Sequence, residues 1–276
     1  MQLCLLGHVE ARLDDVPLEL GGAKQRAVLA MLGLEANRTV TADRLIEGLW
    51  GEEAPASAAK MVQNYVWRLR KALSEDGGAE ILTRGRAYEL KIDRELVDVL
   101  RLERLVAEAA RTPNGDTARQ ALALFRGEPL ADVADEPFAS SEIRRLEELR
   151  LTAAELAIDA DLAAGRHHEV VAEIDALLTA NPLRERLHVQ RLLALYRCGR
   201  QADALEAYRR ARETLVEQIG VEPGPELQRV HAAILRQDPA LDVQPAATEL
   251  AAELDAAAAP PLIGREREIA TLRDLW

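Results

Sequence analysis

The sequence predicts a mainly α-helical protein with a small β component, in which a winged helix-turn-helix precedes an all-α repeat domain. Two patterns indicate this: strands, three helices and a hairpin in succession over residues 1–94, and a 34-residue repeat further along. Composition agrees, because aromatic residues make up only 3% of a chain that is 48% hydrophobic. Leu, Val, Ile and Ala must therefore fill the core, which favours packed helices over a β-sandwich.

Short strands are expected first. In residues 1–20 apolar and polar side chains partly alternate, and the turn signal "DDVP" interrupts them at residues 14–17. From Ala23 apolar residues recur at near-helical spacing, and Thr41 then supplies the N-cap of a second, short helix. These patterns predict a small sheet followed by two helices.

A longer helix and a hairpin complete the N-terminal part. The connector "GEEAP", residues 51–55, separates the short helix from a helix predicted over residues 56–73. The segment "ILTRGRAYELKI", residues 81–92, is typical of a β-hairpin with its tip at Gly85. A short helix, a tight connector, a longer basic helix and a trailing hairpin together predict a helix-turn-helix with a wing.

Helices are expected almost throughout the chain after residue 95. Breaks are predicted at residues 113–115 and in the proline-bearing loop 128–138, with long amphipathic helices from Ser140 to about Leu235.

An internal repeat lies within this helical part. "LAAGRHHEVVAEI" aligns with "YRCGRQADALEAY", which places Gly165 and Gly199 34 residues apart. That period is typical of tetratricopeptide helix hairpins, although glycines also recur by chance. Apolar residues match at the same offset, Val171 with Leu205 and Ile174 with Tyr208. These matches favour a true repeat.

Charge divides the chain into unlike blocks. Residues 1–94 hold 13 basic and 14 acidic residues, so they contribute only −1 to the formal net charge of −12. The remainder holds 22 basic and 33 acidic residues, a net −11. We therefore expect separate domains. The predicted organisation is a winged helix-turn-helix domain at 1–94, a helical domain at 95–238, a linker at 239–261 and the start of a further, truncated domain at 262–276.

The helix predicted at residues 56–73 has an outward face without acids. At 100° per residue, the apolar side holds Ala59, Val62, Val66, Leu69 and Leu73. The opposite side holds Ser57, Lys60, Asn64, Trp67, Arg68 and Lys71, with Gln63, Tyr65 and Arg70 at the flanks. No acid occurs between Ala54 and Ser74, whereas ordinary solvated helix faces mix both signs. Charge alone leaves a solvated face open; the helix order and the wing favour a surface that meets nucleic acid.

The outward residue types suit duplex DNA. Arg68 can donate two parallel hydrogen bonds to guanine O6 and N7, and Asn64 or Gln63 can pair with adenine N6 and N7. Lys60 and Lys71 suit phosphates, which supply affinity without sequence information.

The wing and the loop before the second helix offer further candidates. Arg84 and Arg86 flank the glycine at the hairpin tip, and a narrow minor groove attracts such arginines. Thr39 can contact phosphate, whereas Thr41 is equally well explained as a helix cap. Tyr88 is expected to pack in the core.

Several segments resemble one bacterial regulator family. "LDDVPLELGGAKQRAVLAMLGL", "TADRLIEGLWGEEAP", "YVWRLRKAL" and "ILTRGRAYEL" resemble the OmpR-type winged helix of the Streptomyces antibiotic regulatory proteins. "EPFASSEIRRLEELRLTAAE" and "NPLRERLHVQRLLALYRCGRQADALEAYRRARETL" resemble the tetratricopeptide-like bacterial transcriptional activation domain of the same family. The resemblance covers residues 2–238. The tail "PPLIGREREIATLRDL" is similar to the segment that opens the ATPase domain of large, AfsR-like members, which implies that a longer protein continues beyond it.

The resemblance implies a transcriptional activator, with functions in antibiotic biosynthesis. Such proteins bind direct repeats in double-stranded promoter DNA, associate side by side on DNA and recruit RNA polymerase. Arg68 is then the best base-contact candidate with Arg70 nearby, and Arg86 the best minor-groove candidate. The connector, with Glu52, Glu53, Ala54 and Pro55, corresponds to the loop that meets polymerase. Trp67 departs from the family, since a small polar residue is expected there.

Other chemistry finds little support in the sequence. We expect no enzyme activity, no catalytic residues, no cofactor and no metal, because no GxxxxGK[ST] phosphate loop or nucleophile constellation occurs. His167 and His168 are expected as a surface pair at a hairpin end rather than metal ligands. Cys4 and Cys198 lie far apart, which predicts a reduced, cytoplasmic protein. A DNA-binding function implies that it is associated with the nucleoid. No apolar run reaches the ~20 residues of a membrane span. The alternative function is a tetratricopeptide-type interaction scaffold without specific DNA binding.

Overall fold

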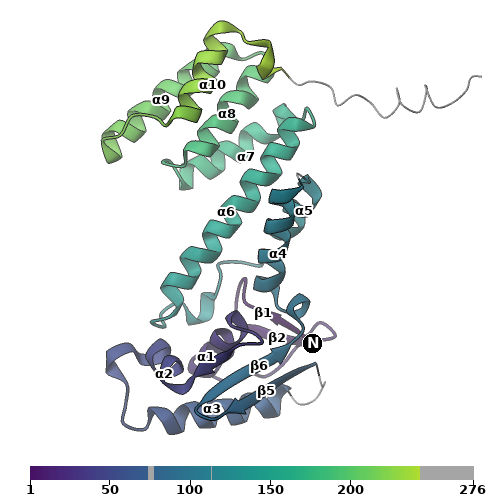
Figure 1. The fold of residues 1–276 in the computed structure, drawn as a ribbon, viewed down its shortest axis with the longest axis vertical. Helices are drawn as coiled ribbons and strands as arrows, with labels where there is room; N and C mark the ends of the chain where they lie inside the picture. The colour runs from purple at the N-terminus through teal and green to yellow at the C-terminus, as the bar shows by residue number, and fades with distance from the viewer. Residues whose placement is uncertain (74–77, 113, 243–276) are drawn as a thin grey trace, which may run out of the picture.

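The computed structural model describes residues 1–73, 78–112 and 114–242, and Figure 1 shows a mixed N-terminal lobe and a helical lobe connected along α6. Most of the predicted linker, 239–261, and the whole predicted domain start, 262–276, lie outside the described residues. Those two expectations therefore stay predictions.

Two small antiparallel sheets form the β component of the N-terminal lobe. β1 (Gln2–Cys4), β2 (Glu10–Leu13) and β3 (Val16–Pro17) pair in that order. β4 (Thr39–Thr41) and β5 (Ala79–Arg84) pair on either side of β6 (Ala87–Ile92). At the β2–β3 turn Asp14 and Asp15 adopt φ angles of 48° and 66°, the positive values that a two-residue type I′ hairpin requires. The predicted short strands at the N-terminus and the hairpin at Gly85 are confirmed. The predicted turn 14–17 is shorter than expected, because Val16–Pro17 already form β3, and β4 lies where a loop was predicted.

Three helices complete this lobe: α1 (Ala23–Leu34), α2 (Ala42–Trp50) and α3 (Ala58–Leu73). The Thr41 hydroxyl accepts a hydrogen bond from the Arg44 amide at 3.2 Å, so the predicted N-cap of α2 is confirmed. The 3-10 turn η1 (Gly51–Glu53) then starts the connector to α3.

The core stripe of α3 is confirmed at four of its five predicted positions. Val62, Val66, Leu69 and Leu73 are buried. Ala59 was predicted in this stripe and is exposed, which corrects the prediction; Ala58 is buried instead. Ala58 lies about 40° from Val62 around the helix axis and Ala59 about 60° on the other side, so the first turn faces the core through Ala58.

The helical lobe consists of α4 (Asp98–Arg111), α5 (Gly115–Leu122), α6 (Ala139–Ala163), α7 (His167–Ala180), α8 (Glu185–Arg197), α9 (Gln201–Ile219) and α10 (Pro225–Arg236). Short 3-10 turns occur at η2 (Arg94–Leu96), η3 (Ala131–Val133) and η4 (Pro239–Leu241). In Figure 1, α6 runs from the N-terminal lobe to the helices α7 to α10.

The predicted repeat is visible in the helix ends. Gly165 and Gly199 have φ angles of 83° and 74°, the left-handed values that end α6 and α8. The amide after each glycine bonds the carbonyl five residues before it: Arg166 N to Asp161 O and Arg200 N to Leu195 O, both at 2.9 Å. The same cap therefore recurs at the same offset, and the repeated helix hairpin is confirmed.

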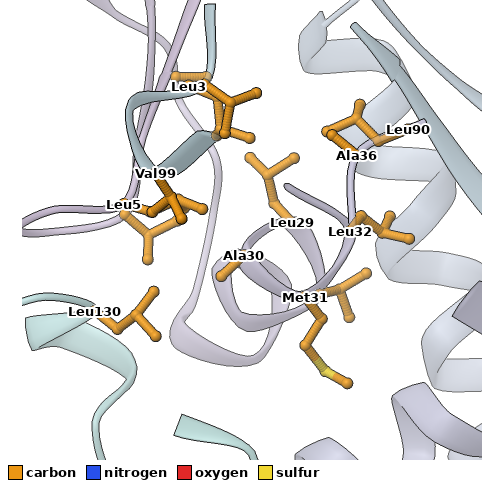
Figure 2. Close-up of a cluster of buried hydrophobic side chains, with 14 of the residues drawn as sticks. Leu3, Leu5, Leu29, Ala30, Met31, Leu32, Ala36, Leu90, Val99 and Leu130 are labelled. Carbon is orange, nitrogen blue, oxygen red and sulfur yellow. The ribbon is translucent and has the colours of Figure 1, made fainter. Parts of the chain in front are cut away.

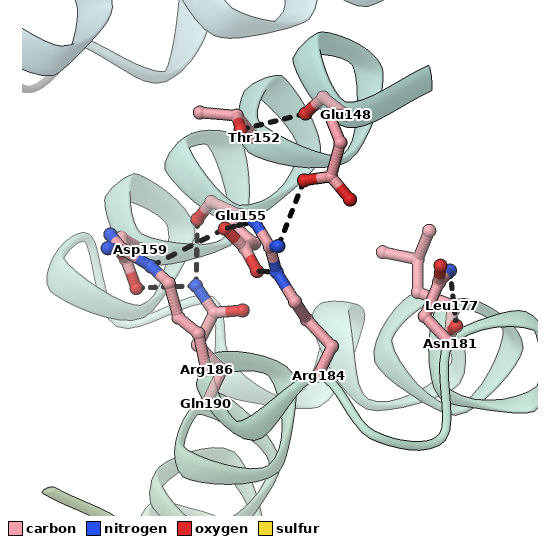
Figure 3. A network of polar contacts seen from close by, with 9 residues as sticks. All are labelled: Glu148, Thr152, Glu155, Asp159, Leu177, Asn181, Arg184, Arg186 and Gln190. Atoms are coloured by element: carbon pink, nitrogen blue, oxygen red, sulfur yellow. Dashed lines mark hydrogen bonds and ion pairs between the residues drawn. The ribbon is translucent and has the colours of Figure 1, made fainter. Parts of the chain in front are cut away.

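A polar network fastens α8 to α6 (Figure 3). The Glu155 side chain is only 4% exposed, and its carboxylate accepts from Arg184 Nε at 2.7 Å. The Gln190 amide donates to the Glu155 carbonyl at 2.8 Å and to Asp159 at 2.6 Å. A buried carboxylate needs such partners, because its desolvation otherwise raises the energy of the folded state.

The two lobes share one hydrophobic core. Figure 2 shows Leu5 and Leu29 of the N-terminal lobe beside Val99 and Leu130 of the helical lobe, and all four belong to a single buried cluster. The boundary predicted at residue 94 follows charge and motifs, and packing is continuous across it.

Carboxylates that are largely removed from solvent link the two lobes. Asp98, in the first turn of α4, accepts hydrogen bonds from the amides of Leu5 at 2.8 Å and Leu6 at 2.9 Å. Glu136 pairs with Lys24 at 2.6 Å, and Asp132 pairs with Arg26. Desolvation raises the pKa of Asp98 from 3.8 to about 6, against the lowering effect of the Leu6 and Leu5 amides and of Arg126.

The free energy of unfolding should depend on pH through Asp98. Its folded pKa exceeds its ordinary value, so the folded chain keeps a proton that the unfolded chain releases between about pH 4 and pH 6. The resulting stability, at most about 3 kcal/mol, is present below this window and lost as pH rises through it. Urea unfolding of wild type and Asp98→Asn at about pH 5 and about pH 7.5 measures this contribution. A wild-type decline no larger than that of the variant would contradict it.

Candidate nucleic-acid interface

The outer face of α3 gathers most of the predicted contact residues. Lys60, Gln63, Asn64, Trp67, Arg68 and Lys71 are all exposed. They project opposite the stripe that holds α3 in the core, because the two sets lie half a turn apart on the helix. Figure 1 places α3 at the end of the molecule remote from α8, α9 and α10, where the helical lobe leaves it uncovered.

Arginines elsewhere in the described chain are mostly paired with acids. Examples are Arg104 with Glu95 at 2.6 Å and Arg119 with Glu173 at 2.8 Å. Within the described ranges, by contrast, neither Lys60 nor Arg68 makes a hydrogen bond or an ion pair. The sequence of α3 contains no acid that could pair with them along the helix. Their charges are therefore available to an anionic partner.

Arg70 turns away from this face. Its Nε donates to the Ile81 carbonyl at 2.7 Å, and a terminal nitrogen donates to the Thr83 hydroxyl at 2.6 Å. Both acceptors lie on β5, so Arg70 joins α3 to the wing. Arg70 was expected near the base contact of Arg68. In the structure it points to β5 instead, whereas Arg68 stays exposed on the outer face.

The wing presents its arginines at an exposed tip. Gly85 has a φ of 63°, which lets the chain reverse between β5 and β6. Arg84 pairs with Glu89 at 3.1 Å. Arg86 lies 3.7 Å from Asp43 at the start of α2, with side chains 89% and 79% exposed. Such exposed pairs are worth at most about 1 kcal/mol, so DNA phosphates can displace Asp43.

The remaining candidates lie on β4, on β6 and in the connector between α2 and α3. Thr39 is exposed on β4, and Tyr88 of β6 is 9% exposed, which confirms its predicted place in the core. The connector residues Glu52, Glu53, Ala54 and Pro55 are all exposed between α2 and α3. Sequence patterns did not indicate the contact of Asp43 with Arg86, since it joins residues on separate elements.

The histidine pair differs from expectation. His168 is exposed, but His167 is buried at 9% exposure, which corrects the prediction of a surface pair. His167 opens α7, and burial lowers the pKa of its imidazole. Among the described residues no group of three His, Cys, Asp or Glu side chains is arranged to hold a metal ion. None of the described helices is both long and apolar enough to cross a membrane.

Comparison with known proteins identifies the family. Residues 17–90 match the family described as "Transcriptional regulatory protein, C terminal", and residues 97–235 match the "Bacterial transcriptional activator domain". The sequence is 37% identical to the regulatory protein DnrI of Streptomyces peucetius, over 88% of this chain and 94% of DnrI. The chain belongs to the Streptomyces antibiotic regulatory protein family. Its fold is an OmpR-type winged helix-turn-helix followed by the family's activation domain.

Larger relatives and a solved structure agree. The regulatory protein AfsR of Streptomyces coelicolor is 43% identical over 88% of this chain, and the chain spans 25% of AfsR. The structure of Mycobacterium tuberculosis EmbR in complex with a low-affinity phosphopeptide superposes with a TM-score of 0.80 at 34% identity. That match covers 93% of this chain and 69% of the EmbR chain. The chain thus carries the DNA-binding and activation domains of a transcriptional regulator.

The different surroundings of Arg70 and Arg68 predict different effects on stability. Arg70→Met should lower the free energy of unfolding by about 1–3 kcal/mol, because the Ile81 carbonyl and the Thr83 hydroxyl lose a charged donor. Arg68→Met, on the same helix, is the matched control and should change stability by less than about 0.5 kcal/mol. Urea unfolding of both variants measures the difference. Equal losses would show that Arg70 does not fasten the wing.

Proposed function

We propose that the chain is a sequence-specific transcriptional activator that binds direct repeats in promoter DNA and recruits RNA polymerase. The observation that carries this proposal is the acid-free outer face of α3, with Lys60 and Arg68 unpaired among the described residues. In a protein of net charge −12, a cationic face without acids favours binding of a polyanion such as DNA. The family suggests that its targets are secondary-metabolite genes, and the protein would act at the nucleoid in the cytoplasm.

In this proposal α3 enters the major groove. Arg68 donates to a guanine edge and Asn64 or Gln63 pairs with an adenine, since these side chains match the hydrogen-bonding groups of those bases. Lys60 and Lys71 neutralise phosphates and so set affinity without choosing a sequence.

The wing would then reach the adjacent minor groove. Arg86 exchanges Asp43 for the groove, because the negative potential of a narrow minor groove exceeds that of one exposed carboxylate. Arg84, on the wing, and Thr39, on the neighbouring strand β4, would contact phosphates. Arg70 positions the wing and makes no base contact in this proposal, because its guanidinium donates to Ile81 and Thr83.

The polymerase contact is proposed at the connector. Glu52 and Glu53 are exposed with Ala54 and Pro55 on a loop that the core does not cover. Acids in this loop would repel DNA. The loop would therefore stay away from the duplex and be free to contact a protein while α3 occupies the groove.

A salt titration tests DNA binding. Affinity for a promoter duplex that carries direct repeats should fall steeply from about 50 to about 200 mM salt, since each neutralised phosphate releases counterions. Lys71→Ala should weaken all sequences alike and reduce the logarithmic salt slope by about 1. Arg68→Ala should instead remove about 1–3 kcal/mol of discrimination at one base position. Flat or absent binding would favour the alternative, a repeat scaffold that binds proteins through exposed apolar residues such as Ile219 and Val221.

Side-by-side association predicts a strict spacing of the repeats. Two copies should bind cooperatively when the repeats lie one helical turn apart, because both α3 helices then face the same side of the duplex. Inserting about 5 bp, half a turn, should abolish the cooperativity and leave single-site affinity unchanged. Titrations of the two duplexes by mobility shift measure it. Cooperativity that survives the insertion would rule out the head-to-tail arrangement.

A further inference from the structure

Trp67 is the part of the α3 face that the proposed function does not yet use. Its side chain is 63% exposed, and among the described residues only Val16, at 64%, is a more exposed large hydrophobic. Within the same part of the chain Trp67 makes no hydrogen bond or ring contact. The free protein therefore keeps a large apolar surface in water, which gains free energy once a partner covers it.

The surroundings of Trp67 restrict what that partner can be. Trp67 lies between Asn64 and Arg68 along α3, the two side chains that the proposed function assigns to base edges. A shallow hollow of about 430 Å³ adjoins the indole, lined on α3 by Arg68 and Lys71 and on the opposite side by Glu19 and Gly21, before the start of α1. Whatever covers the indole must fit between groups directed at bases.

We propose that Trp67 contacts the 5-methyl group of a thymine and makes the protein select thymine at one position of its site. This inference rests on the proposed function, since it places α3 in the major groove. The edges of bases there present hydrogen-bond donors and acceptors, with the thymine methyl as their one apolar group. An indole face cannot replace the hydrogen bonds that base edges make with water, but it can cover the thymine methyl group, which makes none.

The other apolar surface of DNA is deoxyribose, which is the same at every position. A contact there would raise affinity for all sequences alike, whereas a methyl contact raises affinity for one base. Replacing thymine by uracil removes only the methyl group and leaves all hydrogen-bonding groups of the pair. This substitution therefore distinguishes the two contacts.

The test uses the tightest duplex that wild-type protein enriches from a randomised pool, together with copies in which each thymine in turn is uracil. At one position, uracil should weaken wild-type binding about threefold to tenfold, as expected for one buried methyl. Trp67→Ala should bind the thymine and uracil copies equally. Trp67→Ser, tested by enrichment from the same pool, should lose the thymine preference at that position alone. Val16→Ala, which removes an equally exposed apolar side chain at the β2–β3 turn, should retain the wild-type response.

The outcomes separate this inference from the proposed function. If wild type enriches a duplex but binds every uracil copy like the parent, the thymine contact is wrong and DNA binding stands. A uracil effect that persists undiminished in Trp67→Ala would also overturn the contact. If wild type enriches no sequence at all, the proposed function fails and the thymine contact with it. Thermal unfolding of both Trp67 variants at the wild-type temperature excludes misfolding as the cause.

Discussion

The carboxylate of Asp98 joins the N-terminal strand to the helical lobe, and the orientation of the α3 face follows from that contact. Its oxygens accept the amides of Leu5 and Leu6, so the chain after β1 is bound to the first turn of α4. Leu29 of α1 packs in the core formed on both sides of this link, and α3 packs in turn on α1. The helical lobe is therefore held in a fixed orientation relative to α3.

The same constraint explains why the outer face of α3 is exposed although the lobes share a core. The lobes meet through α1, the first sheet and the segments around Asp98 and Glu136, whereas the residues on the outer face of α3 are exposed. Elsewhere in the described chain most arginines pair with an acid, so the surface there carries charges of both signs. Along α3 the sequence omits acids instead. Affinity for DNA would then come from the local positive charge of α3, against the repulsion between DNA and the net negative protein. That affinity should therefore depend strongly on ionic strength.

Much of the fold was predictable because it is local. The N-cap at Thr41, the core stripe of α3 and the glycine pair of the repeat each follow from spacing within one or two elements. The direction of Arg70 was not predictable, since its acceptors Ile81 and Thr83 lie on another element. The burial of His167 likewise follows from packing around the start of α7. For the site, the sequence correctly identified the exposed face of α3. Tertiary contacts decide which of its cations are bound by other residues, as Arg70 is.

The wing combines a fixed base with an adjustable tip. Arg70 holds β5 against α3 through two short hydrogen bonds to one guanidinium, so the angle between helix and wing is set before any DNA is bound. At the tip, the described structure holds Arg84 by an ion pair with the partly buried Glu89 and Arg86 by one with the exposed Asp43. Ordering a wing on contact with DNA would cost conformational entropy and reduce affinity, and a wing already in place avoids that cost. Exchanging an exposed carboxylate for phosphates costs little by comparison. The angle between α3 and the wing is thus fixed before binding. The charges that would exchange partners on DNA lie at the solvated tip of the wing.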